Sequence, residues 1–575
     1  MKRFNQQTFS GILIWAQALM LAVPNVALSA AGQLPPVAAA ANILLPAGIY
    51  LLLMSWSGNI GRNIVLSLPL TVIAAFQIVL LYLYADGSVI AVDMFLNVAT
   101  TNSSEAMELL GNLANAVIIV MIMYLPVLTA GIIFWTRGIR TSHRQRHFAR
   151  ITGLGAAVAG AAAMAISYSL IPHYKAEYDI FPVNALFNLQ EAVHRKIRTD
   201  NYAATSSEYT FNVSNTPPDK TREIYVAVVG ETSRADNYQI FGYDRFTTPL
   251  LNTVDSLVAY EKVLSESNTT HKSVPMLLST IEADEYNDSI YVSKSIITAF
   301  KEAGFHTAFL SMQSRNRSFI DFFGEEADTT IFIREQHATA NGQNITDLDI
   351  LPYLDSLLVS IPDQKVLIVL HLYGSHFNYN DRYNRSDVFF LPDKTADASP
   401  ANRTQLINAY DNTIRHTDRL LYQLIQRLDT IGCPGAMLYT SDHGEDIFDD
   451  GRLRFLHASP SPTFTQLHVP LILWANEEYR NIKPQKWRAA HAARHDEISS
   501  SESFSHTLLD MADIATPRLK PQSAITSGKF EPVTHRQFLN DRNRSVNLIR
   551  AGFTQYDLEM MQKWDMVAPS FTDGR

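Results

Sequence analysis

The sequence predicts an α/β protein in two parts, a transmembrane domain of five helices at residues 1–171 and a soluble domain with a mostly parallel sheet at residues 223–575. Nearly all the long apolar runs lie in the first part, whereas the second part alternates strand-like runs with helical stretches. A surface helix and a linker at residues 172–222 join them. The length of 575 residues also exceeds what one hydrophobic core normally organises.

Five stretches in the first part are long enough to cross a bilayer, and none contains Lys, Arg, Asp or Glu. They cover residues 9–30, 36–56, 64–84, 113–135 and 151–171. The first resembles a signal peptide, but because four more spans follow it, we interpret it as a retained helix. An odd number of spans places the two ends of this domain on opposite sides of the membrane.

Basic residues predict the orientation of the spans. The segment between the last two spans carries five arginines and no acid, and the N-terminus carries Lys2 and Arg3, so both are expected in the cytoplasm. The segment between the third and fourth spans carries acids and no Lys or Arg. Within it, residues 89–111 are expected at the membrane surface, with a helix through residues 105–110. Everything after residue 171 is therefore expected outside the cytoplasm.

The connecting region begins with an amphipathic pattern at residues 183–198, with basic residues near its end, as in a helix that lies on anionic headgroups. A linker rich in Ser, Thr and Asn follows at residues 205–222 and contains Pro217 and Pro218.

The soluble part alternates predicted strands and helices, which favours a mainly parallel sheet covered on both faces. The strands are expected at residues 224–230, 307–311, 366–371, 436–440 and 469–474, and helices at residues 293–303, 350–360 and 408–429. The segment beyond Thr516 is polar and is expected to be irregular.

Polar residues follow several of these strands, at the sheet edge where ligands collect in open α/β folds. Glu231 follows the first strand, and Asp442 and His443 follow the strand at residues 436–440. Thr270 enters a predicted helix, where a threonine hydroxyl is either an N-cap or, beside a metal, a nucleophile. Carboxylate, imidazole and hydroxyl groups together form a set that zinc accepts.

Three more histidines, His376, His457 and His468, stand in or near these loops. Each is ordinary by itself. The net charge of −9 argues against a nucleic-acid partner. Cys433 is the only cysteine, so the chain forms no internal disulfide.

Taken in order, the motifs of the soluble part resemble those of the phosphoethanolamine transferases. These are bacterial inner-membrane enzymes with a periplasmic catalytic domain of the alkaline phosphatase and sulfatase superfamily. The matching residues are VGETSR (229–234) with GYDR (242–245), Thr270 with SVP (273–275), HLYGSH (371–376), NAYDNTI (408–414), SDHGE (441–445) and HVP (468–470). The five preceding spans agree with this family.

The resemblance implies a site and a reaction. Glu231, Thr270, Asp442 and His443 would hold a catalytic Zn²⁺, with Thr270 also the nucleophile; its spacing to Pro275 selects it over Thr269. His376 and His457 would line the substrate phosphate or a further metal position and protonate the leaving group. Phosphoethanolamine would pass from phosphatidylethanolamine, through a phosphothreonine, to a phosphate or sugar of an envelope glycolipid or glycan, such as lipid A or the lipopolysaccharide core. Family members that modify lipid A commonly have several disulfides, which a single cysteine excludes.

Three alternative functions share some of these features. A phosphoglycerol transferase would share the fold and the threonine nucleophile and differ in its donor headgroup. A sulfatase-like hydrolase needs an arginine where this chain has Leu277. A membrane sensor or transport component would be expected to carry ionisable residues within its spans, and these spans lack Asp, Glu, Lys and Arg.

Overall fold

The computed structural model describes residues 2–32, 34–84, 88–100, 114–172, 174–214, 222–337, 345–395 and 397–569. The chain divides into two compact units. The first comprises Met1–Ala99, Ser103–His194 and Gly451–Arg454, and the second comprises Thr100–Asn102, Arg195–Asp450 and Phe455–Arg575. The domain boundaries expected at residues 171 and 222 stay predictions.

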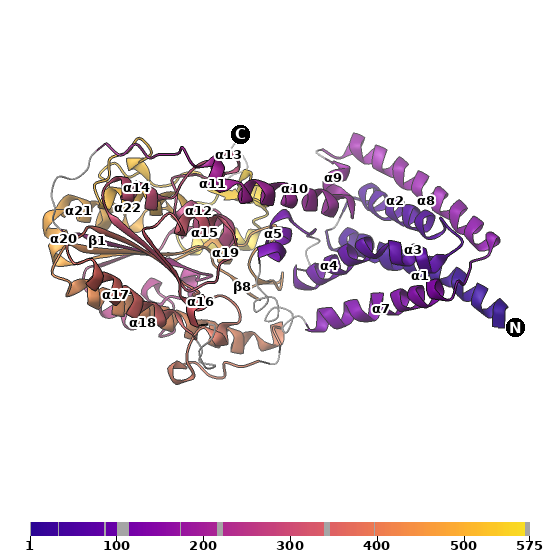
Figure 1. Cartoon of the computed structure of the whole chain (residues 1–575), viewed down its shortest axis with the longest axis horizontal. Helices are drawn as coiled ribbons and strands as arrows, with labels where there is room; N and C mark the ends of the chain where they lie inside the picture. The colour runs from indigo at the N-terminus through magenta and orange to yellow at the C-terminus, as the bar shows by residue number, and fades with distance from the viewer. Residues whose placement is uncertain are drawn as a thin grey trace. The chain divides into compact units, whose positions relative to one another are not determined.

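The first unit is helical (Figure 1). Its helices are α1 (Lys2–Ala31), α2 (Pro36–Met54), α3 (Ile60–Leu66), α4 (Leu68–Tyr84), α5 (Val92–Thr100), α7 (Ala114–Thr136), α8 (His143–Leu170), α9 (Ala176–Asp179) and most of α10 (Val183–Asp200). By length and composition, α1, α2, α7 and α8 are able to cross a membrane. The pair α3 and α4 makes a fifth candidate, bent by 58°.

The third expected span is therefore not one straight helix at residues 64–84. The break falls at Ser67, whose hydroxyl donates to the Ile64 carbonyl (2.7 Å). Pro69 follows, and because proline has no N–H, it cannot continue the helical hydrogen bonds across this point. Pro24, Pro46 and Pro126 stand inside continuous helices, so a proline in an apolar run did not by itself predict this bend.

Helices α2 and α8 approach each other closely through glycine. A Cβ atom on Gly160 would lie only 2.2 Å from the Leu45 backbone nitrogen, so a larger residue does not fit there. Such small-residue contacts are typical of helices that pack within a bilayer. Helix α8 begins at His143, before the expected start of the span, where Ser142 and Gln145 form a capping box.

Two expectations concern helices near the membrane surface. The helix expected through residues 105–110 lies outside the described residues. The helix expected at residues 183–198 is confirmed as α10. Its contact with anionic headgroups stays a prediction.

The second unit is built on a seven-stranded sheet with the strand order β2-β10-β7-β1-β6-β4-β5. The strands are β1 (Ile224–Gly230), β2 (Leu257–Tyr260), β4 (His306–Ser311), β5 (Thr329–Phe332), β6 (Val366–His371), β7 (Gly435–Ser441) and β10 (Leu471–Ala475). The mainly parallel sheet is confirmed, because β7, β1, β6, β4 and β5 pair in parallel. Strand β10 runs antiparallel to both of its neighbours, and β2 and β5 are additional to the expected strands.

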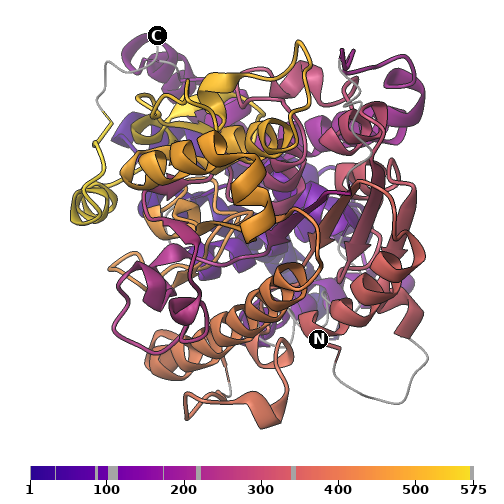
Figure 2. The ribbon, with the colours of Figure 1, turned by 90° about the vertical axis from the view of Figure 1, so that its left-hand side faces the viewer.

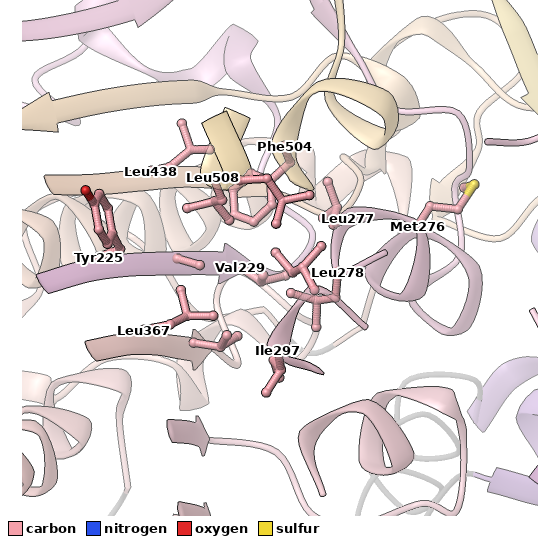
Figure 3. Packing of buried hydrophobic residues seen from close by; sticks show 14 of the residues in the cluster. Tyr225, Val229, Met276, Leu277, Leu278, Ile297, Leu367, Leu438, Phe504 and Leu508 are labelled. Carbon is pink, nitrogen blue, oxygen red and sulfur yellow. The ribbon is translucent and has the colours of Figure 1, made fainter. Parts of the chain in front are cut away.

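Both faces of the sheet are covered, and β1 lies at its centre. Tyr225, Ala227 and Val229 enter one apolar cluster, while the intervening residues of β1 enter the other. Helices α12 (Thr270–Leu277), α14 (Ile296–Glu302), α15 (Phe319–Gly324) and α22 (Ser500–Met511) contribute to the first cluster, and α17 (Leu351–Ser360) and α18 (Arg403–Asp429) to the second. Figures 1 and 2 show α18 on the side of the sheet opposite α22. In Figure 3, Val229 lies among Leu277, Leu278 and Leu508.

Smaller elements complete the second unit. They are α11 (Tyr202–Thr205), α13 (Tyr286–Ser289), α16 (Ile333–His337), α19 (Phe464–Leu467), α20 (Glu477–Ile482) and α21 (Pro484–Ala492), with the strand pairs β3 (Val263–Leu264) and β11 (Ile498–Ser499), and β8 (Asp446–Ile447) and β9 (Phe455–Leu456).

Among the described residues, the segment beyond Thr516 forms regular elements, so the expectation of an irregular tail was wrong. It forms β12 (Gln537–Leu539), β13 (Ser545–Asn547), α23 (Leu548–Ala551) and α24 (Gln555–Lys563). Each short element buries only a few apolar side chains, which gather against α19: Phe538, Leu548, Phe553, Met561 and Met566. Elements this short carry no periodic hydrophobic pattern along the sequence, which is why the tail was missed.

Phe538→Ala is expected to destabilise the second unit by about 3–5 kcal/mol, because Phe538 is 2% exposed in this cluster and its loss leaves a cavity. The apparent melting temperature of the purified chain should fall. Val567→Ala, at a position that is 70% exposed, is the control and should leave it nearly unchanged. Equal melting temperatures for both variants would contradict this packing.

Candidate metal and catalytic site

The sheet brings the predicted acids and His443 together at one edge. Glu231 follows β1, and Asp442 and His443 follow β7. These strands are parallel neighbours with Gly230 paired to Ser441, so the residues after them emerge side by side. Thr270, the first residue of α12, reaches the same place. Glu231, Asp442 and His443 are at most 1% exposed, whereas Thr270 is half-buried.

The four predicted ligands meet within hydrogen-bonding distance. The Thr270 Oγ1 lies 3.1 Å from Glu231 Oε1 and 3.2 Å from His443 Nε2. The His443 Nε2 lies 3.2 Å from Asp442 Oδ2 and 3.5 Å from Glu231 Oε1. By contrast, the Thr269 hydroxyl faces Ser267 at 3.2 Å. The structure therefore brings Thr270, and not Thr269, to this cluster.

His457 joins the same group. One donor atom each from Glu231, His443 and His457 lies within 4.8 Å of the others, a spacing at which they are able to hold a metal ion. The ring centroids of His443 and His457 are 4.3 Å apart, and the His376 ring lies 5.8 Å beyond that of His457. His376 is thus next to the group without belonging to it.

The three histidines share one orientation. The Nδ1 atom faces the Gly444 carbonyl in His443 (2.8 Å), the Phe377 carbonyl in His376 (2.6 Å) and Glu445 Oε1 in His457 (3.1 Å). Because these oxygens only accept, Nδ1 carries the proton in each ring. Every ring therefore presents Nε2 for binding a metal or moving a proton.

Glu445 contacts the cluster of predicted site residues, although the sequence assigned it no role. Its carboxylate is buried, with Oε1 facing His457 and Oε2 accepting a hydrogen bond from the Tyr379 hydroxyl (2.8 Å). A carboxylate behind a histidine fixes the ring and increases its basicity. The only signal in the sequence was its position two residues after His443.

The electrostatics of the cluster favour a bound cation. Burial, and then the charge of Glu231, raises the pKa of Asp442 well above its ordinary range. Burial lowers the pKa of His443 to about 3, so this ring is neutral, as a metal ligand must be. For His457, burial lowers the pKa but Glu445 outweighs it, leaving the pKa above its ordinary value. Two adjacent buried acids repel each other, and a divalent cation would relieve that repulsion.

Gly374 holds the backbone of Glu231 in place. Its φ is +52°, and an added Cβ would lie 2.5 Å from the Glu231 carbonyl oxygen. The next residue, Ser375, donates its N–H to that same oxygen (2.8 Å). The Gly-Ser-His sequence at residues 374–376 thus positions Glu231 as well as supplying His376.

Two histidines from the quoted motifs lie elsewhere. His371 Nδ1 contacts the Ser311 hydroxyl (3.1 Å). His468 is fully buried, with Nδ1 2.7 Å from Asp236 Oδ2 and Nε2 2.9 Å from the Glu261 carbonyl. His468 therefore connects the segments that contain Asp236 and Glu261.

Two further motifs pair with each other. The Arg245 guanidinium contacts Asp411 (2.6 Å) and Asn408 (2.6 Å), and the Tyr243 hydroxyl donates to Asp411 (3.1 Å). The loop after β1 is thereby fixed to α18, which gives the segments at 242–245 and 408–414 a scaffolding role.

Ser273 occupies the position that a sulfatase would modify. Its hydroxyl donates to the Thr269 carbonyl of its own helix (2.9 Å) and lies 3.3 Å from Asp442 Oδ2. Thr270 takes the position nearest to Glu231 and His443. The geometry therefore favours Thr270 over Ser273 as the nucleophile.

Comparison with known proteins defines the class. The sequence profile of the sulfatase family matches residues 223–514, and the chain belongs to this family. The Kdo(2)-lipid A phosphoethanolamine 7''-transferase of Salmonella typhimurium is 28% identical over 285 residues, which cover 49% of this chain and 49% of that protein. The chain thus spans about half the length of this relative.

Two solved structures share the fold. The integral membrane protein lipooligosaccharide phosphoethanolamine transferase A (EptA) from Neisseria meningitidis superposes with a TM-score of 0.70 at 20% identity, over 89% of this chain and 98% of that one. The periplasmic domain of EptC from Escherichia coli, in complex with Zn, gives a TM-score of 0.53 at 22% identity, over 60% of this chain and 97% of that one. The first match confirms the expected combination of apolar helices and a sulfatase-type α/β domain.

Gly374→Ala is expected to displace Glu231, because the added Cβ clashes with its backbone and the positive φ costs at least about 1 kcal/mol. Bound zinc per protein, measured by mass spectrometry of the purified chain, should fall. Gly528→Ala, where a Cβ meets no atom within 4 Å, is the control. Full zinc content in the Gly374 variant would show that this contact does not position Glu231.

Proposed function

We propose that this chain transfers phosphoethanolamine from phosphatidylethanolamine to a phosphate or sugar of an envelope glycolipid, in lipid A or the lipopolysaccharide core. The observation that carries the proposal is the Thr270 hydroxyl, held 3.1 Å from Glu231 and 3.2 Å from His443 at the start of a helix. A helix N-terminus favours the phosphate group that this oxygen would attack. The Salmonella relative, named as such a transferase, supports the same chemistry.

A zinc ion is proposed at the cluster, held by Glu231, Asp442, His443 and Thr270. The donors are the oxygen and nitrogen types that zinc takes, and the similar EptC domain was solved in complex with Zn. When bound, zinc would lower the pKa of the Thr270 hydroxyl and offset negative charge on the phosphate oxygens.

The reaction proceeds in two displacements. Thr270 Oγ1, deprotonated with its proton released to water, attacks the phosphorus of the donor, the phosphorus–oxygen bond to glycerol breaks, and diacylglycerol leaves. His376 or His457, protonated at both ring nitrogens, gives the leaving oxygen the proton of Nε2 and keeps that of Nδ1, which faces a fixed acceptor. An oxygen of the acceptor then attacks the phosphothreonine, the Oγ1–phosphorus bond breaks to restore Thr270, and the ring regains its proton from the acceptor hydroxyl or from water.

The apolar helices of the first unit indicate where the protein is located in the cell. We place the five candidate spans in a bacterial inner membrane and the second unit in the periplasm, because the arginines at residues 137–150, between α7 and the apolar part of α8, favour the cytoplasmic side. Donor and acceptor are both amphiphiles that stay in the bilayer. A membrane-tethered site therefore meets them at a high effective concentration.

A phosphoglycerol transferase remains the second candidate, because the Thr270 geometry suits either headgroup. Incubating the purified chain with phosphatidylethanolamine and phosphatidylglycerol in turn, and following diacylglycerol release, distinguishes the two donors.

Thr270→Ala is expected to abolish both the covalent adduct and transfer, lowering turnover about a thousandfold or more, because the attacking oxygen is gone. Mass spectrometry of protein incubated with donor alone should find phosphoethanolamine on the peptide at residues 268–276 of the unaltered chain. Thr269→Ala, whose hydroxyl faces Ser267, is the matched control and should keep the adduct. An adduct that persists in the Thr270 variant would rule out this nucleophile.

Asp442→Ala is expected to lower bound zinc sharply while the second unit stays folded, since Asp442 is a proposed ligand. Zinc content and circular dichroism of the purified chain measure the two effects. Asp429→Ala, at the exposed end of α18, should keep its zinc. Equal zinc content in the two variants would remove Asp442 from the ligand set.

A further inference from the structure

Gln313 lies next to the proposed metal site, although no sequence motif pointed to it. It stands two residues after β4, in the loop that begins at Ser311. Ser311 pairs with His371 at the end of β6, and its hydroxyl accepts the Gln313 N–H (3.1 Å). These contacts fix the turn, and the Gln313 side chain reaches Glu231.

The amide of Gln313 uses its nitrogen twice. Nε2 donates to Glu231 Oε2 (3.2 Å) and to the Leu372 carbonyl (3.0 Å). Both partners are oxygens that only accept, so the nitrogen, and not the amide oxygen, must face them. This settles the orientation of the amide group, and both of its N–H bonds are used. The side chain thus joins the loops that follow β1, β4 and β6.

The two oxygens of Glu231 have different surroundings. Oε1 accepts from Thr232 (2.6 Å) and Thr270 (3.1 Å) and lies 3.5 Å from His443 Nε2. Oε2 accepts from Gln313. One oxygen therefore faces the nucleophile and the proposed zinc ligands, and the other faces a neutral amide.

We propose that Gln313 is a positioning residue that holds Glu231 Oε2, so that Glu231 offers a metal only Oε1. This rests on the proposed zinc site. The carboxylate is 1% exposed, so without Gln313 its second oxygen would lack this donor or turn toward the metal. An amide suits this task, because it donates without a positive charge that would weaken the attraction of Glu231 for a cation.

Gln313→Met tests the proposal, because methionine keeps the length of the side chain and loses the N–H donors. The full chain is purified in detergent, stripped with a chelator and titrated with Zn²⁺ against a competing indicator. The zinc dissociation constant is expected to rise about 10–100-fold, as for other residues that orient metal ligands. The Co²⁺-loaded variant should lose visible absorption, because a second oxygen from Glu231 adds a fifth ligand to a tetrahedral site.

Gln336→Met, at an exposed position of α16, is the matched control and should behave as the unaltered chain. Gln313→Asn keeps the amide but withdraws it by one methylene. Its zinc dissociation constant and Co²⁺ spectrum should therefore change in the same direction as those of the methionine variant, and it replaces that variant if the latter fails to fold. A Gln313 variant with unchanged zinc affinity and Co²⁺ spectrum would overturn the proposal. Neither measurement uses lipid, so a failure of the proposed transferase activity would be seen separately in the donor assay.

Discussion

Two carboxyl groups, Glu231 and Asp442, are buried side by side at the ends of adjacent parallel strands, and the site depends on how their charge is balanced. Parallel pairing of β1 with β7 forces this proximity, because each acid follows the last paired residue of its strand. Burial and the charge of Glu231 raise the pKa of Asp442, because holding two ionised carboxylates at this buried position costs free energy. A bound divalent cation would offset that cost, with Thr270, the proposed nucleophile, beside it.

The surrounding side chains hold this cluster without neutralising it. Glu231 accepts hydrogen bonds from Thr232, Thr270 and Gln313, none of which carries a charge. Carbonyl groups fix the rings of His443 and His376, and Glu445 fixes that of His457. Neutral donors around the acid and fixed acceptors behind the rings keep the negative charge available to a metal, and leave Nε2 of each histidine available to the reaction.

The sequence profile and the structural match cover different parts of this chain. The sulfatase-family profile covers the second unit, and the EptA structure extends the likeness of fold to the apolar helices. The name of the Salmonella relative supports the proposed donor headgroup and acceptor, whereas the geometry around Thr270 supports the proposed nucleophile.

The sequence by itself determined the apolar helices, the main parallel strands and the residues that meet at the site. These follow from local patterns, because span length, strand alternation and the position of a residue after a strand are all legible along the chain. Tertiary structure alone decided the bend between α3 and α4, the antiparallel direction of β10 and the ordered tail around Phe538. It also decided the contacts of Gln313 with Glu231 and of Glu445 with His457, because neither pair is adjacent in the sequence. Contacts of this kind leave no periodic signal, and they arise only when the loops of several strands meet at one edge of the sheet.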